Sequence, residues 1–385
     1  MPKIISLHEP FFKGNEKKYI LKCLESTWIS TAGNLIKKFE EQIKKFTKTK
    51  HSIACINGTS ALHIGLKICG VKKNDEVIAP SITFIAPINA IKYCNANPIF
   101  MDSDNFFNID TKKVVNFLNS STYMRNNHCY NKRTKKRISA IIVVHVWGNL
   151  VDLDDLVFIC KKKNIKIVED ASEALGSFYS KGTFKNNHAG TIGDVGCLSF
   201  NGNKIITSGA GGMILTNKKL LSKKASYLIN QAKDNNKYFI HNEIGYNFRL
   251  TNLHSAIGLS KIEKINKILK IKKNIHNLYK NIFNKINGLS ILENPSFSKS
   301  NNWLNILSVS KDFKRSILWI EKKLKKNNIE SRFVWLPNHK QKQYLKNFKY
   351  KITNTNNLVN YSLCMPSSIN IKKNDIIKIA KLINE

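Results

Sequence analysis

Short apolar runs and amphipathic stretches alternate along the first two thirds of the chain. Residues 52–56 and 138–144 are mostly apolar, as expected of strands that are buried on both faces of a sheet. Residues 35–46 and 86–93 carry apolar side chains at every third or fourth position, which predicts helices. This alternation predicts an α/β fold, with a mostly parallel sheet flanked by helices.

The pattern changes near residue 250. Residues 253–278 keep one face apolar over what the spacing predicts to be a single very long helix. Shorter strand and helix patterns then alternate up to residue 383, which is typical of a smaller α+β unit. We therefore predict a large domain over residues 1–250, beginning with an N-terminal arm, and a linking helix with a small C-terminal domain over residues 251–385.

Composition excludes several classes of protein. The 385 residues are 42% hydrophobic, enough to fold around a sizeable core. No apolar run approaches the roughly 18–20 residues that span a bilayer, and the first residues lack the apolar region of a signal peptide, so we expect a soluble, cytoplasmic protein without membrane contact. The eight cysteines are scattered without a Cys-x-x-Cys pair, which indicates buried thiols and neither a disulfide framework nor a metal site.

The formal net charge of +37 raises the possibility of a nucleic-acid partner. Only six of the cations are arginines, however, and the lysines are spread along the chain among asparagine and isoleucine. This distribution favours a compositional bias of the solvated surface over nucleic-acid binding. The alternative, a basic nucleic-acid binder on an inactive enzyme fold, stays open, and the positive charge could also attract a polyanionic small molecule.

A phosphate-binding turn is predicted where the strand at 52–56 gives way to a helix. Gly58, Thr59 and Ser60 stand at this junction, where backbone amides, the helix dipole and the two hydroxyls can all face one anion. The turn is neither a Walker loop nor a dinucleotide-binding fingerprint. A hydroxyl residue at this place can also be a simple helix cap.

Candidate chemistry follows three later strand patterns. Phe84 comes after the strand at 76–80, where it could stack on a flat ring or pack into the core. Asp170 ends the apolar strand that begins at residue 165, where it could be a catalytic carboxylate or a helix cap. Lys204 lies in a glycine-rich loop and could form a Schiff base.

These four features together match the needs of pyridoxal phosphate. Its phosphate requires helix N-terminal amides, and its ring requires an aromatic face. A buried carboxylate such as Asp170 keeps the pyridine nitrogen protonated, and the aldehyde requires a lysine such as Lys204. Each feature has an ordinary structural explanation, but their joint occurrence at successive strand ends predicts a pyridoxal phosphate site.

At these residues the chain resembles the DegT/StrS-type sugar aminotransferases, over residues 5–370. The resemblance is carried by residues 57–62, 81–84, 143–145, 169–171, 199–204, 209–212 and 245–250. Residues 6–10, 201–206 and 131–137 look closest to the subgroup that serves legionaminic acid-type and bacillosamine-type pathways. Val143 and Ala210 depart from the family pattern, which usually has Pro and either Glu or Gly at these places. Neither departure removes a group that the chemistry requires.

The resemblance implies a fold-type I pyridoxal phosphate enzyme that acts as a homodimer. It implies transfer of an amino group from L-glutamate to the 4-keto carbon of a UDP-linked 4-keto-6-deoxy-N-acetylhexosamine, with a GDP-linked 4-keto-6-deoxymannose as the alternative acceptor. By the same resemblance Lys204 holds the cofactor and then moves the proton, Asp170 pairs with the pyridine nitrogen, and Phe84 stacks on the ring.

The remaining site residues are also assigned by resemblance. Thr59, Ser60 and Ser199 are expected to bind the phosphate, with Asn247 reaching in from the partner subunit. Glu173 stands where many members carry His or Gln near the phenolic oxygen of the cofactor. Three further residues lie in segments that resemble the family's sugar-nucleotide contacts, namely Trp28, Ser30 and His339.

Overall fold

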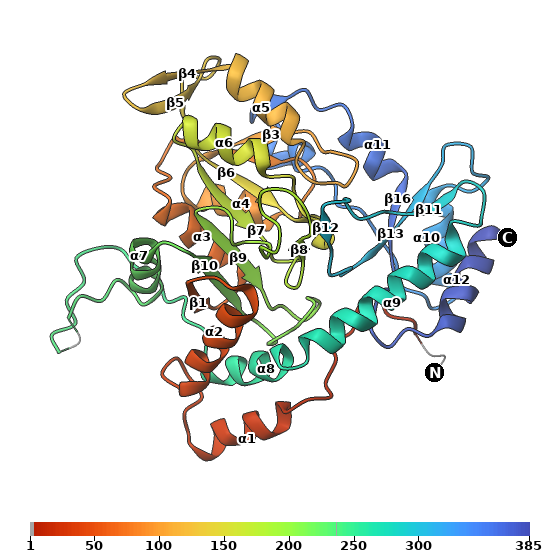
Figure 1. Ribbon diagram of the computed structural model, residues 1–385, viewed down its shortest axis with the longest axis horizontal. Helices are drawn as coiled ribbons and strands as arrows, with labels where there is room; N and C mark the ends of the chain where they lie inside the picture. Colours follow the sequence, from red (N-terminus) through yellow and green to blue (C-terminus); the bar gives the residue numbers. More distant parts are fainter. Residues whose placement is uncertain (1–3, 236) are drawn as a thin grey trace.

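The computed structural model describes residues 4–235 and 237–385 (Figure 1). The strands of its central sheet are β1 (His51–Cys55), β2 (Glu76–Pro80), β3 (Asn97–Met101), β4 (Thr122–Arg125), β5 (His128–Asn131), β6 (Arg137–Val144), β7 (Lys166–Asp170), β9 (Val195–Ser199), β10 (Gly212–Thr216) and β15 (Lys349–Tyr350). They are ordered β1-β10-β9-β7-β6-β2-β3-β15, with the β4–β5 hairpin attached to β6. Neighbours from β9 to β15 run parallel, whereas β10 is antiparallel to both β1 and β9. The predicted α/β fold with a mostly parallel sheet is confirmed.

Helices join these strands and cover the sheet. They are α1 (Glu16–Glu25), α2 (Asn34–Thr47), α3 (Gly58–Ile68), α4 (Ala86–Tyr93), α5 (Thr111–Ser120), α6 (Asp154–Lys162) and α7 (Lys219–Ile229), with a short 3-10 turn η1 (Val146–Gly148). The central strands β2, β6 and β7 are buried along almost their whole length. Their mostly apolar sequences reflect this burial on both faces of the sheet.

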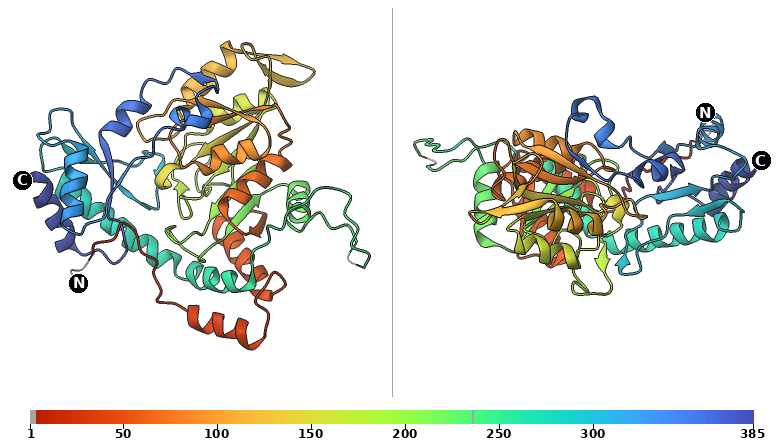
Figure 2. Two further views of the ribbon diagram at one scale, coloured as in Figure 1. Left: turned by 180° about the vertical axis from the view of Figure 1, so that it is seen from behind. Right: turned by 90° about the horizontal axis from the view of Figure 1, so that it is seen from above.

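A smaller α+β unit follows, as the sequence predicts. Its elements are α8 (Asn252–Ile262), α9 (Ile265–Phe283), β11 (Leu289–Ile291), β13 (Asn305–Val309), α10 (Ile317–Lys326), β14 (Arg332–Phe333), η2 (Asn338–Lys340), η3 (Lys342–Tyr344), α11 (Thr355–Asn360), β16 (Ser362–Met365) and α12 (Lys373–Asn384). The antiparallel sheet β11-β13-β16-β14 has an apolar core of its own against α9, α10 and α12. Both views of Figure 2 place this unit beside the large sheet, on the side away from α7.

Two short strands lie outside the two larger sheets. Strands β8 (Phe178–Tyr179) and β12 (Ser298–Lys299) pair in a separate two-stranded sheet that joins the two parts of the chain. All eight cysteines are buried and free, as predicted. Within the described residues, no helix is both long and apolar enough to cross a membrane. The exact domain boundary at residue 250 stays a prediction.

The single long helix predicted over residues 253–278 is wrong. The structure has two helices there, α8 and α9, separated at Glu263 and Lys264. Helix α8 packs against α1 and α2, whereas α9 packs against α12 and β11. Glu263 accepts hydrogen bonds from Asn15 Nδ2 (2.8 Å) and Tyr19 Oη (2.6 Å) at the break. Each helix buries one apolar face, so the apolar side chains keep a helical spacing through the break. The sequence pattern therefore does not show that α8 and α9 pack against different elements.

Residues 120–137, a polar and basic excursion between α5 and β6, are partly ordered in the sheet. Strands β4 and β5 form a hairpin, and β5 pairs with β6. Asn131 at the end of β5 donates a hydrogen bond to Glu76 Oε2 at 2.9 Å. The excursion therefore extends the central sheet beyond β6.

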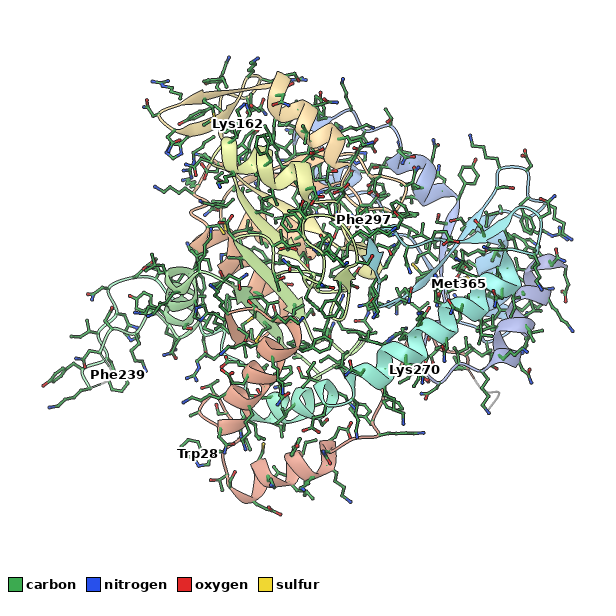
Figure 3. All side chains as sticks on the ribbon, viewed as in Figure 1. Trp28, Lys162, Phe239, Lys270, Phe297 and Met365 are labelled. Carbon is green, nitrogen blue, oxygen red and sulfur yellow. The ribbon has the colours of Figure 1, made fainter. Side chains whose placement is uncertain are left out.

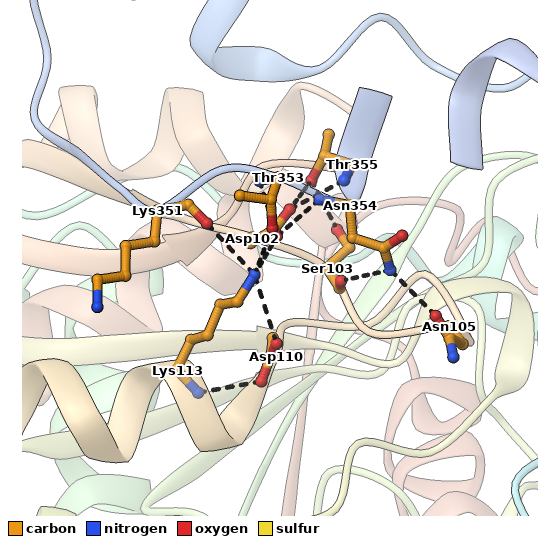
Figure 4. A network of polar contacts seen from close by, with 9 residues as sticks. All are labelled: Asp102, Ser103, Asn105, Asp110, Lys113, Lys351, Thr353, Asn354 and Thr355. Carbon is orange, nitrogen blue, oxygen red and sulfur yellow. Dashed lines mark hydrogen bonds and ion pairs between the residues drawn. The ribbon is translucent and has the colours of Figure 1, made fainter. Parts of the chain in front are cut away.

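The C-terminal segment crosses back to the large sheet before it forms α11. Strand β15 pairs with β3, and the residues after it are held by Asp102 (Figure 4). The Asp102 carboxylate is fully buried and accepts hydrogen bonds from the amides of Thr353, Asn354 and Thr355, each at 2.9 Å. The Lys113 ammonium forms an ion pair with the same carboxylate. The segment from β15 to the start of α11 is thus attached to the large sheet, although the elements before and after it belong to the C-terminal unit.

Candidate active site

A pocket of about 520 Å³ lies where the carboxyl ends of the parallel strands meet the C-terminal unit. Such strand ends are the usual ligand-binding edge of an open α/β sheet. The structure brings seven of the predicted site residues together in its wall: Gly58, Thr59, Phe84, Asp170, Glu173, Ser199 and Lys204. Residues as far apart in the sequence as Gly58 and Lys204 thus converge in one place because they follow the ends of neighbouring strands.

The predicted phosphate turn is the start of α3. Its helix cap is Asn57, whose side-chain oxygen accepts from the Ser60 amide at 2.7 Å, so neither hydroxyl residue serves as the cap. A Cβ on Gly58 would stand 2.8 Å from Ser199 Cβ, which leaves room only for glycine at this approach. Thr59 and Ser199 face the pocket, whereas Ser60 is buried and is not part of the pocket wall.

Asp170 ends β7 beside the end of β6. It is buried, and its Oδ1 accepts the Ser172 amide at 3.0 Å in a turn, not at the start of a helix. The helix-cap alternative is therefore wrong. Burial raises the pKa of the Asp170 carboxyl, although hydrogen bonds from Ser172 and the charge of Lys204 oppose the shift.

His145 and Glu169 lie behind Asp170 in the core. The Nδ1 atom of His145 accepts from the Val151 amide at 3.1 Å, so Nε2 carries the proton and donates to Glu169 at 2.9 Å. Glu169 also accepts hydrogen bonds from backbone amides of the 190–193 turn. Burial alone would raise the pKa of this carboxyl, but the hydrogen bonds from His145 and from these amides lower it below its usual value. His145 is thus a buried core histidine, while Glu169 organises the turn between β7 and β9.

Lys204 reaches the pocket from the loop between β9 and β10. Its Nζ lies 3.2 Å from Glu173 Oε1 and 4.4 Å from the centroid of the Trp303 ring. Glu173 Oε2 accepts the Trp147 amide at 2.9 Å. Burial raises the pKa of the Glu173 carboxyl, and the Lys204 charge opposes this shift. The amine is therefore fixed between a carboxylate and an aromatic face.

Phe84 is 55% exposed and lines the pocket, so it does not pack into the core. The turn η2 packs against the loop that carries Phe84, where Asn338 Nδ2 donates a hydrogen bond to the carbonyl oxygen of Thr83 at 2.8 Å. His339 is buried in the same contact and bonds through Nδ1 to the hydroxyl of Ser81. In this chain His339 supports the Phe84 loop and does not line the pocket.

Three other predicted residues lie outside the pocket of this chain. Trp28 is 58% exposed in the connection between α1 and α2 (Figure 3), and Ser30 follows it in the same connection. Asn247 forms an isolated bridge with Asn230 after α7. Their roles toward substrate or a partner subunit stay predictions.

The sequence analysis missed several residues of the pocket wall. His8, Trp303, Arg332 and Trp335 line the pocket, and they come from the N-terminal segment and the C-terminal unit. His8 lies in the segment 6–10 that resembles the subgroup, but the resemblance gave it no role, and the other three residues lie outside the motifs. Aromatic residues before or after short strands were the only available signal, and such residues are common in cores.

Comparison with known proteins shows the family of the chain. The family model described as "DegT/DnrJ/EryC1/StrS aminotransferase family" matches residues 11–384. The chain belongs to this family. GDP-perosamine synthase of Escherichia coli O157:H7 is 33% identical over 384 residues, which cover 100% of this chain and 98% of that protein. UDP-4-amino-4,6-dideoxy-N-acetyl-beta-L-altrosamine transaminase of Campylobacter jejuni is 30% identical over 279 residues, which cover 72% of this chain and 69% of that protein.

Among solved structures, the putative sugar aminotransferase Spr1654 of Streptococcus pneumoniae in its PMP form has a TM-score of 0.85 at 20% identity, over 98% of each chain. This DegT/DnrJ/EryC1/StrS aminotransferase is therefore a sugar aminotransferase that uses pyridoxal phosphate. Its pocket fits the cofactor: the close approach of Gly58 to Ser199 leaves a cradle, and Asp170 and Lys204 supply the required carboxylate and amine.

Proposed function

We propose that the enzyme transfers the amino group of L-glutamate to the C4 keto carbon of a nucleotide-linked 4-keto-6-deoxyhexose. The observation that carries this proposal is the position of Lys204, whose amine lies in one pocket with Glu173, Asp170 and the start of α3. For the acceptor, we favour GDP-linked 4-keto-6-deoxymannose. The relative named GDP-perosamine synthase aligns over nearly its whole length at 33% identity, which supports this choice.

A UDP-linked 4-keto-6-deoxy-N-acetylhexosamine is the second candidate. The sequence motifs favoured this acceptor, and the Campylobacter jejuni transaminase named for a UDP-linked N-acetyl sugar supports it at 30% identity over 69% of that protein. We rank this acceptor second because the alignment with its relative is shorter and the identity is lower. Both acceptors carry a diphosphate, which the positive charge of the protein attracts.

The roles of the residues follow from their contacts. When bound, pyridoxal phosphate supplies an aldehyde carbon that takes up the amino group and an electron-poor ring that stabilises negative charge. Asp170, buried at the end of β7, would hold a proton on the ring nitrogen by its negative charge. Thr59 and Ser199 would bind the phosphate, and Phe84 would cover one face of the ring. Lys204 Nζ would form the covalent attachment and then move a proton, with Glu173 keeping the amine in place.

We infer that the protein acts as a homodimer. Residues 231–235 and 237–246 project from the large unit after α7 (Figures 1 and 3), and this arm exposes Tyr238, Phe239 and Ile244, the last at 82%. Projecting apolar side chains of this kind are typical of a surface that a partner covers. Asn247, at the base of the arm, would then approach the pocket of the second copy.

Two experiments test the proposal. Incubation with L-glutamate and each of the two keto-sugar nucleotides, followed by mass spectrometry, should show amination of the GDP-linked sugar at the higher rate. Faster amination of the UDP-linked sugar would reverse the ranking, and no product from either would refute the proposed reaction. Borohydride treatment of the loaded enzyme should attach the cofactor to a peptide that contains Lys204, and a Lys204→Ala variant should show no such peptide.

A further inference from the structure

One corner of the pocket wall contains polar groups without partners. His8, from the N-terminal segment, lines the pocket beside Trp303, and the centroids of the two rings are 6.3 Å apart. Both ring nitrogens of His8 are shielded from water, and in the described part of the chain neither has a hydrogen-bond partner. Buried polar atoms of folded proteins are nearly always paired, so this histidine calls for a partner that is not part of the protein.

The backbone just before His8 is fixed by contacts with the C-terminal unit. Ile5 bridges to Ile329 in the C-terminal unit. The Leu7 amide donates to Glu330 Oε2 at 2.9 Å, and the Leu7 carbonyl oxygen accepts the Ser367 amide at 2.6 Å. The ring therefore belongs to a built wall and not to a loose terminus, which is what a preorganised ligand contact requires.

A buried lysine makes this corner positive. Lys272 of α9 is fully buried, and its Nζ donates to the carbonyl oxygens of Trp303 (2.6 Å) and Ser367 (2.5 Å). Among the described residues, no carboxylate forms an ion pair with it. Burial lowers the pKa of Lys272 to about 7, and burial together with the charges of Lys272 and Lys204 holds the pKa of His8 well below its usual range. The amine is therefore only partly protonated at neutral pH, and an anionic ligand nearby would favour its charged form.

The reaction supplies such an anion. The proposed function already assigns the cofactor's phosphate to the start of α3 and Ser199, whereas His8 comes from the N-terminal segment and lies beside Trp303. In an amino acid the carboxylate is attached to the carbon that bears the transferred nitrogen, whereas the diphosphate of a sugar nucleotide is separated from the keto carbon by the hexose ring. Lys204 marks the reacting position, and its Nζ lies 4.4 Å from the centroid of the Trp303 ring. The His8 ring lies beside the same Trp303 ring in the same pocket, so an anion next to His8 would lie near the reacting nitrogen.

We propose that His8 contacts a carboxylate of the amino donor, in a corner of the pocket that Lys272 keeps positive. This inference rests on the proposed amino transfer from glutamate. His8 is the residue that touches the donor, and Lys272, whose amine is held by backbone carbonyls, acts through its charge as a positioning residue. Arg332, which lines the same pocket and is exposed, is placed to meet the second carboxylate of a dicarboxylic donor.

Separate half-reactions test the assignment. His8→Leu should raise the KM for L-glutamate in the first half-reaction by about tenfold to a hundredfold, the range for loss of a hydrogen bond to a charged group, and leave the reaction of the aminated enzyme with the keto-sugar nucleotide unchanged. His8→Gln, which retains an N–H donor, should recover most of the loss. Glutarate, which has no amine and cannot react, should bind the loaded wild-type enzyme in calorimetry and bind His8→Leu weaker by the same factor.

A matched control comes from a second histidine. His63 Nε2 is also shielded and without a hydrogen-bond partner in the described residues, but His63 does not line the pocket, so His63→Leu should leave both half-reactions and glutarate binding unchanged. Equal losses in both half-reactions, a loss confined to the sugar half-reaction, or no loss in His8→Leu would each overturn the assignment. If wild-type enzyme accepts no amino group from glutamate at all, the proposed function fails instead, and glutarate binding still reports on the corner.

Discussion

The Asp102 network gives a prediction that links the fold to the pocket (Figure 4). Asp102 is fully buried at the end of β3 and accepts the amides of Thr353, Asn354 and Thr355, while Lys113 supplies the charge that balances it. The variant Asp102→Asn keeps the shape but turns an amide N–H toward groups that are themselves donors. We expect the segment after β15 to lose its hold on the large sheet.

The magnitude follows from the number and kind of contacts. A hydrogen bond to a charged group contributes about 1.5–3 kcal/mol, and removal of one partner from a buried ion pair costs about 3–5 kcal/mol. The Lys113 side chain is 25% exposed, so solvent screens its part of the interaction. We therefore expect Asp102→Asn to lower the free energy of unfolding by about 3–4 kcal/mol, mostly through the backbone amides.

Urea unfolding and hydrogen exchange measure this effect. The amides of residues 353–355 should exchange faster in Asp102→Asn, and a matched Lys113→Met variant should lose only about 1 kcal/mol because it retains the amide contacts. Equal effects of both variants would show that the ion pair and not the amide cluster holds the segment. Unchanged exchange at these three amides in Asp102→Asn would refute the reasoning.

The same residue predicts a pH dependence. Backbone amides and Lys113 hold the pKa of Asp102 well below its usual range despite burial. A depressed carboxyl pKa adds stability that is complete above the unfolded value, about 3.9, and is lost as the pH falls from there toward the folded value. The free energy of unfolding of wild type should therefore fall more steeply than that of Asp102→Asn between about pH 4 and pH 2, and parallel slopes would contradict this assignment.

Three further variants test other parts of the structure. Gly58→Ala would bring a Cβ within 2.8 Å of Ser199 Cβ, so overpacking should lower the free energy of unfolding of the apoenzyme by about 1–3 kcal/mol in urea, and displacement of Ser199 should also weaken cofactor binding in a spectroscopic titration. Glu169→Gln removes the charge that binds His145 and the 190–193 amides, and should lower stability by about 2 kcal/mol or more in urea unfolding. Ile244→Lys should shift the protein toward monomer in sedimentation experiments while the unfolding of the monomer stays the same, because the side chain is 82% exposed in the single chain.

The strand-end residues could be predicted because their position follows from the fold class alone. Once the apolar runs indicate a parallel sheet, residues after each run must meet at one edge, so Asp170 and Lys204 could be placed together without coordinates. Contacts between the two units could not be predicted in this way. Trp303 lies beside Lys204, and its carbonyl oxygen is held by Lys272 of α9. The direction of α9 is set at the break after α8, which no glycine or proline marks at Glu263 and Lys264.

Most of the residues that sequence reasoning missed come from the C-terminal unit, which bears on how substrate choice can vary. The cofactor contacts come from the ends of the large sheet, whereas Trp303, Arg332 and Trp335 come from the C-terminal unit. The C-terminal unit also fixes the loop of Phe84, because Asn338 donates to the Thr83 carbonyl oxygen at 2.8 Å. Changes in this unit can therefore reshape the part of the pocket that it lines while the strand ends of the large sheet stay as they are. If the proposed reaction holds, the motifs at the strand ends would specify the chemistry, and residues outside those motifs would be free to vary with the substrate.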